Sequence, residues 1–530
     1  MNNNILITGK LHPEAIERFK GLQGVRLDYT PDCSRELLID KIKDTHILVT
    51  RSETAVDREL LEAADVLKVV ARAAVGVGNI DLEAATERGV LVMNTPGKNT
   101  NSAAELTLGL LIGMLRKITP AQEKVKEGGW DRHRFTGREM RGKTIGIVGL
   151  GHVGHRVAKF CHGFDMKVLA YDPYISPDVF KRYGAKLCSS LEALVSEVDI
   201  LSVHVPLNKE TKGMIHFDLL KKMRQPGFVV NAARGGVVNE NDILRALDQG
   251  LLLGAAIDTF EGEPEPIEAL VKHTNVYCTP HIGASTIEAQ RAIGATVVEQ
   301  VVKFIEGGVV DYPVNLPEVG VIDRPILKAY AVLSEKLGSL TGQILKFNPE
   351  KVEFHYRGDI SELDNSLLRL SWMKGYAAQI VDDYVSFVNA ASYIEAMGIA
   401  IHEATDPDFD SYKSALKVVV TGSSGERMTI GGIVFDDRYL RISMINDFYF
   451  EVEPSGEILI IENFDKPGVI GAVGSELANE GVNISSFALS RNTTGGQAMA
   501  LACVDAELSA ACAEKLRGLD HILSIDTVSL

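Results

Sequence analysis

Apolar and polar positions form repeating blocks along residues 1–98. Short apolar runs with the composition of strands (NILITG, HILVT, LKVVARA and VLVMN) alternate with polar, amphipathic segments typical of helices. Strands that alternate with helices in this way indicate a parallel sheet of α/β type. The pattern therefore predicts a first α/β unit at the N-terminal end.

A second α/β unit is predicted between two long helices, at about 102–118 and 286–306. The second helix is expected to begin with a capping box formed by Ser285 and Glu288. Two long helices on either side of one α/β unit indicate that this unit is inserted into the first, to which the chain returns near Asn315. The strands expected in the inserted unit are TIGIVG, KVLAYD, DILSVHV, FVVNAA, GAAID and NVYCTP.

The remaining pattern predicts two further units. Residues 317–455 indicate an α+β unit with helices around 325–344 and 371–393 and strands ALKVVVTG, IGGIVF and FYFEVEP. Residues 457–530 follow the order βαββαβ of a ferredoxin-like unit. Pro467 is expected in the first turn of its first helix, and Gly481 just beyond the end of that helix.

Composition limits the classes of function. A chain of 530 residues is long enough for three or four domains. The formal net charge of −16 disfavours nucleic-acid binding. The six cysteines include no CxxC pair, which favours a reducing compartment without a zinc site. The most lipid-like run, 106–115, is shorter than the roughly 20 residues of a spanning helix, and the N-terminus lacks a signal-peptide pattern. We therefore expect a cytoplasmic protein with no membrane or nucleic-acid partner.

A glycine-rich loop is the most specific motif of the chain. Gly149, Gly151 and Gly154 have the spacing G-x-G-x-x-G, follow an apolar strand and open a helix. A second strand ends at Asp172, and together these features form the dinucleotide-binding fingerprint. The alternative is an ordinary turn, which would leave the spacing to coincidence. A carboxylate at position 172 accepts hydrogen bonds from ribose hydroxyls and repels a 2′-phosphate, so NAD is expected rather than NADP.

Three candidate catalytic residues follow predicted strands of the inserted unit: Arg234 in NAARGG, Glu263 in FEGEP and His281 in TPHIG. In an open α/β sheet the ligand cleft lies outside the carboxyl ends of the strands, so all three can face it. Each also has an ordinary alternative, as a loop cation, a turn acid and a structural histidine. Together they would supply a base that works near neutral pH, a carboxylate beside it and a planar cation.

The order and spacing of these groups resemble the D-isomer-specific 2-hydroxyacid dehydrogenases over most of residues 1–316. The matching segments are LGHVGHRVAKFCHGFDMKVLAYDP, DILSVHVPLNKETKGMI, NAARGGVVNENDILRAL and PHIGASTIEAQ. The C-terminal unit resembles an ACT domain. The whole chain is similar to the long members of the family that oxidise D-3-phosphoglycerate.

This resemblance implies four domains: a flavodoxin-like substrate domain (1–98 and 287–316), an inserted Rossmann-type NAD domain (99–286), an intervening α+β domain (317–455) and an ACT domain (456–530). It implies that His281 takes the hydroxyl proton, that Glu263 holds and polarises the ring and that Arg234 binds the substrate carboxylate. The substrate contacts that it implies are Arg51, Arg72 and Asn99, with Arg132 reaching the site of a partner subunit; an ordinary surface position is the alternative for Arg132. The implied cofactor contacts are Val75, Gly149, Gly151, His152, Val153, Gly154, Asp172, Val205, Pro206, Ala232, Ala233, Arg234, Asp258, His281, Gly283 and Ala284.

Two positions depart from the family pattern. In the loop RAAVGVGNID, Ala74 and Gly78 replace residues that are usually glycine and aspartate. The departure concerns this substrate and cofactor loop and leaves Arg234, Glu263 and His281 untouched.

The resemblance further implies oxidation of D-3-phosphoglycerate to 3-phosphohydroxypyruvate, the first step of serine biosynthesis, by a homo-oligomer (dimer or tetramer). An ACT domain implies control by L-serine, bound by Asn463 and Asp465 at the start of a helix, with Asn483 contributed by a partner domain. The alternative is that Asp465 only caps the helix and the domain only dimerises. For the whole chain, the alternatives are a hydroxypyruvate or glyoxylate reductase and an NAD-sensing regulator without enzyme activity.

Overall fold

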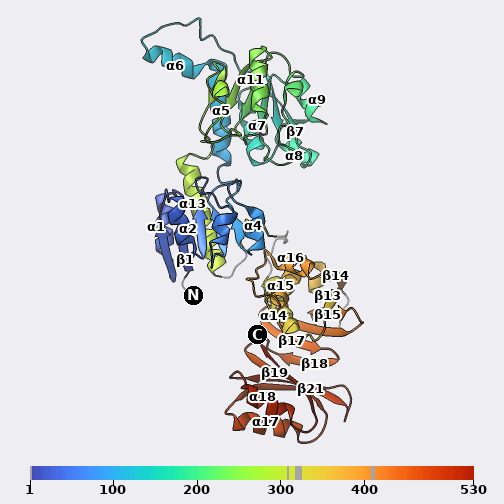
Figure 1. Ribbon diagram of the computed structural model, residues 1–530. Helices are drawn as coiled ribbons and strands as arrows, with labels where there is room; N and C mark the ends of the chain where they lie inside the picture. The colour runs from blue at the N-terminus through green and yellow to red at the C-terminus, as the bar shows by residue number, and fades with distance from the viewer. Residues whose placement is uncertain (1–2, 307–309, 317–324, 408–411) are drawn as a thin grey trace.

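The computed structural model describes residues 3–306, 310–316, 325–407 and 412–530. Within them, four β-sheets follow one another along the chain, and each lies in a separate unit (Figure 1). The first two sheets are parallel, which confirms the predicted α/β class. No helix in the described part of the chain is long and apolar enough to cross a membrane.

The first unit is built on a parallel sheet in the order β2-β1-β3-β4-β5. This is the flavodoxin-like order, in which the chain starts in the sheet interior and extends to both edges. Its strands are β1 (Asn3–Ile7), β2 (Val25–Tyr29), β3 (Ile47–Thr50), β4 (Val69–Arg72) and β5 (Leu91–Met93). Its helices are α1 (Pro13–Lys20), α2 (Arg35–Ile42), α3 (Arg58–Glu62) and α4 (Leu82–Glu87).

The chain returns to this unit through α13 (Ile287–Ile305). Val297, Val298 and Val301 of α13 are buried in one apolar cluster with residues of β1, β3 and β4. Asn315 then accepts a hydrogen bond from the N–H of Val92 (2.8 Å) and donates to the carbonyl of Val90 (2.9 Å). The boundary predicted at residue 316 borders residues 317–324, which lie outside the described residues.

The predicted cap of α13 is wrong. The helix is capped by Thr286, whose side chain accepts a hydrogen bond from the N–H of Ala289 (3.1 Å). Ser285 instead donates its N–H to the carbonyl of Ile282 (2.8 Å), which makes it part of the preceding turn. Two hydroxyl residues stand side by side here, and the tertiary turn decides which of them caps the helix.

The second unit is a seven-stranded parallel sheet in the order β12-β11-β10-β9-β6-β7-β8. The order reverses at β6, the topological switch point at which Rossmann-type sheets bind dinucleotides. Its strands are β6 (Thr144–Val148), β7 (Lys167–Tyr171), β8 (Lys186–Leu187), β9 (Ile200–Val203), β10 (Gly227–Asn231), β11 (Leu252–Ile257) and β12 (Val276–Cys278). Its helices are α5 (Thr100–Arg116), α6 (Ile118–Lys126), α7 (His152–Gly163), α8 (Pro177–Arg182), α9 (Leu191–Ser196), α10 (Phe217–Leu220), α11 (Glu240–Asp248) and α12 (Glu268–Val271).

The third unit has a six-stranded sheet in the order β14-β13-β15-β16-β17-β18. Its strands are β13 (Pro349–Gly358), β14 (Ala400–Asp406), β15 (Ser414–Gly422), β16 (Arg427–Phe435), β17 (Tyr439–Ile445) and β18 (Phe448–Val452). Its helices are α14 (Pro325–Ile344), the 3₁₀ turn η1 (Asp359–Glu362), α15 (Ser366–Ala377) and α16 (Ala390–Ala396).

The single helix predicted over 371–393 is wrong, because the chain leaves the helical path between α15 and α16. In this segment Ser386 donates its hydroxyl to the carbonyl of Gly89 (2.8 Å), and Val388 joins the apolar cluster of the first unit. Contacts with another unit therefore replace the hydrogen bonds of a continuous helix, and local sequence pattern does not report such contacts.

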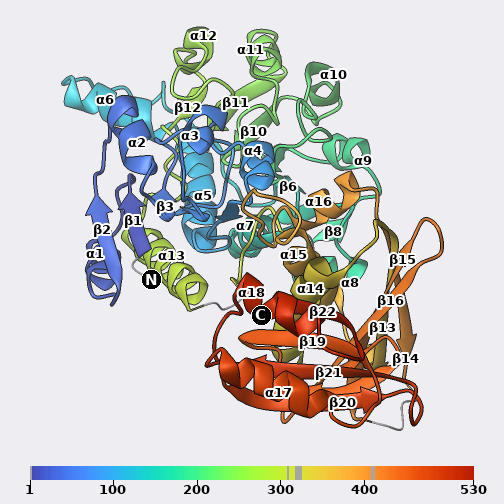
Figure 2. The same ribbon diagram turned by 60° about the horizontal axis from the view of Figure 1, so that its bottom comes forward.

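The fourth unit has an antiparallel sheet in the order β20-β21-β19-β22, the ferredoxin-like arrangement predicted for it. Its strands are β19 (Glu457–Phe464), β20 (Ile484–Arg491), β21 (Gln497–Val504) and β22 (Ile522–Ser529), and its helices are α17 (Val469–Asn479) and α18 (Ala510–Arg517). Figure 2 shows this sheet beside α14. Lys346, which follows α14, forms an ion pair with Asp526 of β22 (2.9 Å). The third and fourth units share one apolar core, to which Ile460 and Leu501 contribute.

Helix α17 begins later than predicted. Its first residue is Val469, and Gly468, with φ of +97°, precedes it as the cap. A left-handed backbone at this position suits glycine and interrupts the helical path, so Pro467 lies outside the helix.

Helices α14 and α15 pack against each other through two glycines. A Cβ on Gly338 would lie 2.2 Å from the carbonyl oxygen of Trp372, and one on Gly375 would lie 2.0 Å from that of Glu335. Hydrogen atoms at these positions therefore set the distance between the two helices.

We expect Gly338→Ala to destabilise the protein, because its methyl group would overlap the backbone of α15. Overpacking of this kind costs about 1–3 kcal/mol. Gly109→Ala is the matched control, since a Cβ there meets nothing within 4 Å and alanine favours a helix by about 0.5–1 kcal/mol. Chemical denaturation of the two variants checks the contrast, and equal stability would contradict the packing argument.

Candidate active site

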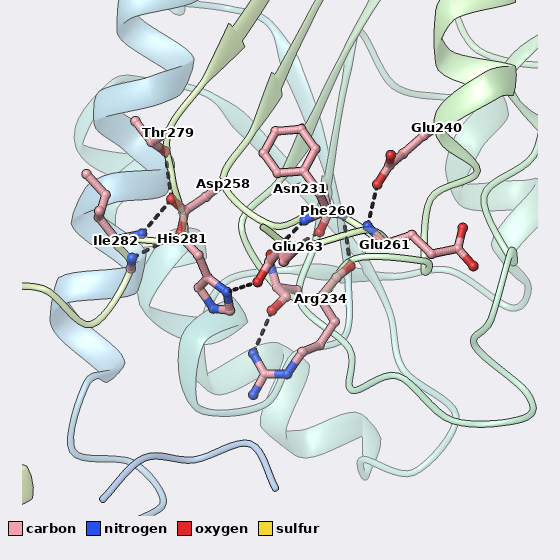
Figure 3. Close-up of polar contacts among 12 residues, drawn as sticks. Asn231, Arg234, Glu240, Asp258, Phe260, Glu261, Glu263, Thr279, His281 and Ile282 are labelled. Carbon is pink, nitrogen blue, oxygen red and sulfur yellow. Dashed lines mark hydrogen bonds and ion pairs between the residues drawn. The ribbon is translucent and has the colours of Figure 1, made fainter. Parts of the chain in front are cut away.

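Arg234, Glu263 and His281 lie beyond the carboxyl ends of three neighbouring strands (Figure 3). Arg234 follows β10, Glu263 follows β11 and His281 follows β12. The parallel pairing of these strands brings together groups that are separated along the chain. Nδ1 of His281 lies 2.7 Å from Oε2 of Glu263. The pair predicted from the sequence is therefore in hydrogen-bond contact.

The contact determines which nitrogen of His281 can act as a base. A carboxylate accepts hydrogen bonds, so Nδ1 carries the proton and donates it to Glu263. Nε2 then holds the free lone pair, and the Glu263 carboxylate fixes the orientation of the ring, as in other acid–histidine pairs. The side chains of His281 and Glu263 are 47% and 36% exposed, so a substrate can reach them.

A buried carboxylate, Asp258, shapes the turn that carries His281. It accepts hydrogen bonds from the Thr279 hydroxyl (2.6 Å) and from the N–H groups of Ile282 (2.8 Å) and Gly283 (3.0 Å). Burial raises the pKa of Asp258, and the hydrogen bonds oppose that shift. His281 has φ of +53° in this turn, a left-handed conformation that is uncommon outside glycine. Asp258 thus organises the His281 turn; its predicted contact with the cofactor stays a prediction.

Arg234 is half-buried in the loop that follows β10. Burial lowers the pKa of its guanidinium, while the nearby charge of Glu263 opposes the shift. Its Nη1 donates to the carbonyl of Ala233 (2.6 Å). The Arg234 loop touches the Glu263 loop closely, since a Cβ on Gly235 would lie 1.9 Å from the carbonyl oxygen of Phe260.

Two further arginines from the first unit lie near Arg234. Arg72, at the end of β4, is 5% exposed, and burial together with the charges of Arg51 and Arg234 lowers its pKa to about 10, against the opposing charge of Glu53. Among the described residues, its Nε and Nη1 have no hydrogen-bond partner. Arg51 donates to the side chain of Gln290 on α13 (2.7 Å). Arg72 therefore lies close enough to Arg51 and Arg234 for their charges to act on it, and Arg234 is likewise close to Glu263.

The glycine-rich loop has the geometry that a dinucleotide requires. Gly149 has φ of +88°, and a Cβ on Gly154 would lie 2.0 Å from the carbonyl oxygen of Gly149. A Cβ on Gly151 would meet nothing within 4 Å, so the loop is open on the side where α7 begins. Because no side chain caps α7, its first N–H groups are available to an anion.

Asp172 lies at the end of β7, next to this loop. Its carboxylate accepts hydrogen bonds from the N–H groups of Leu150 (2.9 Å) and Tyr174 (3.0 Å). These bonds hold Asp172 beside the opening of the loop, where an adenosine ribose of NAD would fit.

The other predicted cofactor residues also follow strand ends or begin α7. Val205 and Pro206 follow β9, Ala232 and Ala233 follow β10, Gly283 and Ala284 follow β12, and His152 and Val153 form the first turn of α7. Val75 follows β4 of the first unit, and its carbonyl accepts a hydrogen bond from Asn94 (2.7 Å). Asn99 precedes α5 without capping it through its side chain.

Arg132 is not brought to this cleft by any contact found among the described residues. It is exposed in the segment after α6, and its guanidinium lies 5.9 Å from the ring centre of Trp130. Helix α6 itself extends away from the second unit and buries none of its residues (Figure 1). A role in the site of a partner subunit stays a prediction.

The proposed serine residues are not gathered in one place within the chain. Asn463 is 4% exposed on β19, whereas Asn483 precedes β20 near the opposite end of the sheet and donates to Asp505 (2.8 Å). Asp465 does not cap α17, contrary to the alternative interpretation. It accepts hydrogen bonds from the N–H of Gly495 (3.0 Å) and from Arg491 (3.2 Å), which tie it to the turn between β20 and β21 and lower its pKa.

Sequence reasoning missed one residue next to the catalytic pair, Glu240. Its carboxylate is 6% exposed and accepts a hydrogen bond from the N–H of Glu261 (2.6 Å). The only local signal was an acid near the start of a polar, amphipathic segment, and acids at such positions are common in helices that face solvent.

Comparison with known proteins decides the family. Residues 108–283 match the family model "D-isomer specific 2-hydroxyacid dehydrogenase, NAD binding domain", and residues 326–446 match "D-3-phosphoglycerate dehydrogenase intervening domain". The D-3-phosphoglycerate dehydrogenase of Methanocaldococcus jannaschii is 35% identical over 99% of both chains, and that of Archaeoglobus fulgidus is 37% identical over 99% of this chain and 100% of its own. The chain belongs to the D-3-phosphoglycerate dehydrogenase family. The predicted family and its NAD-binding domain are thereby confirmed.

Solved structures resemble the first two units. Cofactor (NAD+) bound 3-phosphoglycerate dehydrogenase of Entamoeba histolytica aligns with a TM-score of 0.51 and 29% identity, covering 59% of this chain and 99% of its own. A glyoxylate reductase of Paecilomyes thermophila aligns with a TM-score of 0.54 and 28% identity over 59% of this chain and 98% of its own. The fold of the catalytic units is thus shared by dehydrogenases of several specificities.

Replacing His281 by asparagine should lower kcat by roughly 10²–10⁴-fold, because the proton acceptor is lost. Titration with NADH should show unchanged cofactor affinity, since the glycine-rich loop is untouched. His402→Asn, at an exposed position of β14, is the control and should keep the wild-type rate. Near-normal turnover of His281→Asn at neutral pH would mean that another group is the base.

Proposed function

We propose that this chain oxidises D-3-phosphoglycerate to 3-phosphohydroxypyruvate with NAD, the first step of serine biosynthesis. Relatives that are D-3-phosphoglycerate dehydrogenases match this chain over their whole length, including the two C-terminal units. The family model matched by residues 326–446 is also that of a D-3-phosphoglycerate dehydrogenase domain. The full domain set therefore favours phosphoglycerate oxidation over glyoxylate or hydroxypyruvate reduction.

The proposed roles follow from the geometry of the site. Nε2 of His281 takes the proton from the substrate hydroxyl, and the carboxylate of Glu263, 2.7 Å from Nδ1, stabilises the imidazolium that forms. The guanidinium of Arg234 binds the substrate carboxylate and orients C2. Bound NAD supplies the acceptor for the hydride that leaves C2.

The cluster of Arg51, Arg72 and Arg234 is the observation that carries the proposal. A buried guanidinium with like charges nearby is costly unless an anion compensates for it. Arg72 is 5% exposed, and its unpartnered nitrogens meet that description. One carboxylate would satisfy Arg234 alone, whereas a substrate with a carboxylate and a phosphate can satisfy the whole cluster. Asn99 is proposed as a further contact of the same substrate.

We also propose a cytoplasmic homo-oligomer. The segment that includes α6 presents large apolar side chains to solvent, among them Ile118, Val125 and Trp130, with Trp130 73% exposed. Apolar side chains of this size are typical of protein–protein contacts. Pairing through this segment would carry Arg132 toward a neighbouring subunit.

The assay that tests the function measures NADH formation with D-3-phosphoglycerate and D-glycerate, and NADH consumption with glyoxylate. We expect the wild type to prefer D-3-phosphoglycerate. Arg72→Gln should raise KM for it by roughly 10–100-fold, because a charge-assisted hydrogen bond is lost, and should leave NADH affinity unchanged. Arg26→Gln, on the exposed face of β2, is the control.

A preference for glyoxylate would favour the reductase. NADH binding without turnover of any of the three acids would favour a cofactor-sensing regulator.

L-serine is the second ligand that we propose, for the C-terminal unit with Asn463 and Asp465 from one subunit and Asn483 from a partner. Calorimetry should show heat of binding for the wild type and weaker binding for Asp465→Ala and Asn483→Ala. The exposed Glu507→Ala of the same unit is the control. Serine bound there should lower the oxidation rate through coupling between two sites. No heat with the wild type, or equal binding by all variants, would contradict this assignment.

A further inference from the structure

Glu240 is a buried acid that the proposed mechanism does not use. It is the first residue of α11, after the cap Asn239, and it is 6% exposed. Burial raises its pKa, against the opposing effect of the Glu261 N–H. Among the described residues no cation forms an ion pair with it. A buried, unpaired carboxylate is costly, so its position calls for a function.

The one hydrogen bond found for Glu240 holds the turn that carries Glu263. Its Oε1 accepts the N–H of Glu261 at 2.6 Å, two residues before Glu263 (Figure 3). Within the same turn, Oε1 of Glu263 accepts the N–H of Phe260 at 2.8 Å. Two carboxylates thus fix consecutive N–H groups, and Oε2 of Glu263 is left to contact His281.

The opposite side of this turn is held by the Arg234 loop. The backbone of Gly235 packs directly on Phe260, since a Cβ on Gly235 would lie 1.9 Å from the carbonyl oxygen of Phe260. The turn is therefore clamped between α11 and the loop before it, both of which follow β10. Loss of the Glu240 contact would free one side of the clamp.

Interaction with the helix dipole does not account for the position of Glu240. An acid at the start of a helix gains from the dipole at exposed as well as at partly buried positions, so this gain does not by itself require burial. Asp242 in the same first turn already accepts a hydrogen bond from the N–H of Phe217 (3.0 Å). The distinctive property of Glu240 is its burial against residue 261.

We propose that Glu240 is a positioning residue for the Glu263–His281 pair, acting through the backbone N–H of Glu261. This inference rests on the proposed function, in which Glu263 orients the histidine base. A shift of about 1 Å in a catalytic group can cost up to about 10²-fold in rate, so the clamp matters to turnover.

The experiment compares Glu240→Ala, Glu240→Gln and the wild type by steady-state oxidation of D-3-phosphoglycerate and D-glycerate. Glu240→Ala should lower kcat by roughly 10–100-fold with KM changed less than about threefold, because Arg234 and Arg72 still bind the substrate. Glu240→Gln should restore most of the rate, since its amide oxygen still accepts the N–H. Asp248→Asn, at the exposed end of α11, is the control.

The two acids separate this inference from the proposed function. If the wild type oxidises D-glycerate but not D-3-phosphoglycerate, the proposed substrate is wrong, and the variant-to-wild-type ratio on D-glycerate still tests Glu240. An unchanged kcat in Glu240→Ala would overturn the inference. Equal losses in the Ala and Gln variants, or a rise in KM alone, would also overturn it. If Glu240→Ala does not fold, Glu240→Asp, whose shorter side chain withdraws the acceptor, should show the same loss of kcat.

Discussion

The hydrogen bond between Glu263 and His281 depends on the order of strands in the second sheet. The two residues come from loops after β11 and β12, which pair in parallel, so their carboxyl ends meet at one edge. The same constraint places Arg234 after β10 next to them. A change in strand order would separate the base from the acid that orients it, whatever the local sequence of each loop.

The loops around this pair are held by buried polar groups as well as by the apolar packing of Phe260. Asp258 is fully buried and accepts three hydrogen bonds from residues 279–283, while Glu240 fixes residue 261 from the other side. Buried carboxylates are costly when unpaired and become rigid anchors when backbone N–H groups satisfy them. The lone pair of His281 Nε2 must point at the substrate, so a rigid loop keeps the base in the orientation that proton transfer requires.

The C-terminal units are physically connected to the catalytic half of the chain. The third and fourth units share one apolar core, and Val388 of the third unit packs into the core of the first. Asn389 also approaches Gly89 of the first unit, since a Cβ on Gly89 would lie 2.8 Å from the side-chain nitrogen of Asn389. Packed contacts therefore run without a break from the fourth unit to the unit that carries Arg51 and Arg72.

Features that depend on local pattern could be predicted from the amino-acid sequence. Strand and helix alternation indicated the parallel units, glycine spacing indicated the dinucleotide loop, and Arg234, Glu263 and His281 were found because each follows a strand. Three other features depend on tertiary contacts: Thr286 caps α13, the helical path is interrupted between α15 and α16, and Asp465 faces a turn. It also revealed Glu240. Hydrophobic periodicity records which face of an element is buried, but the partner of a buried polar group comes from a distant part of the chain, and so it is set by packing.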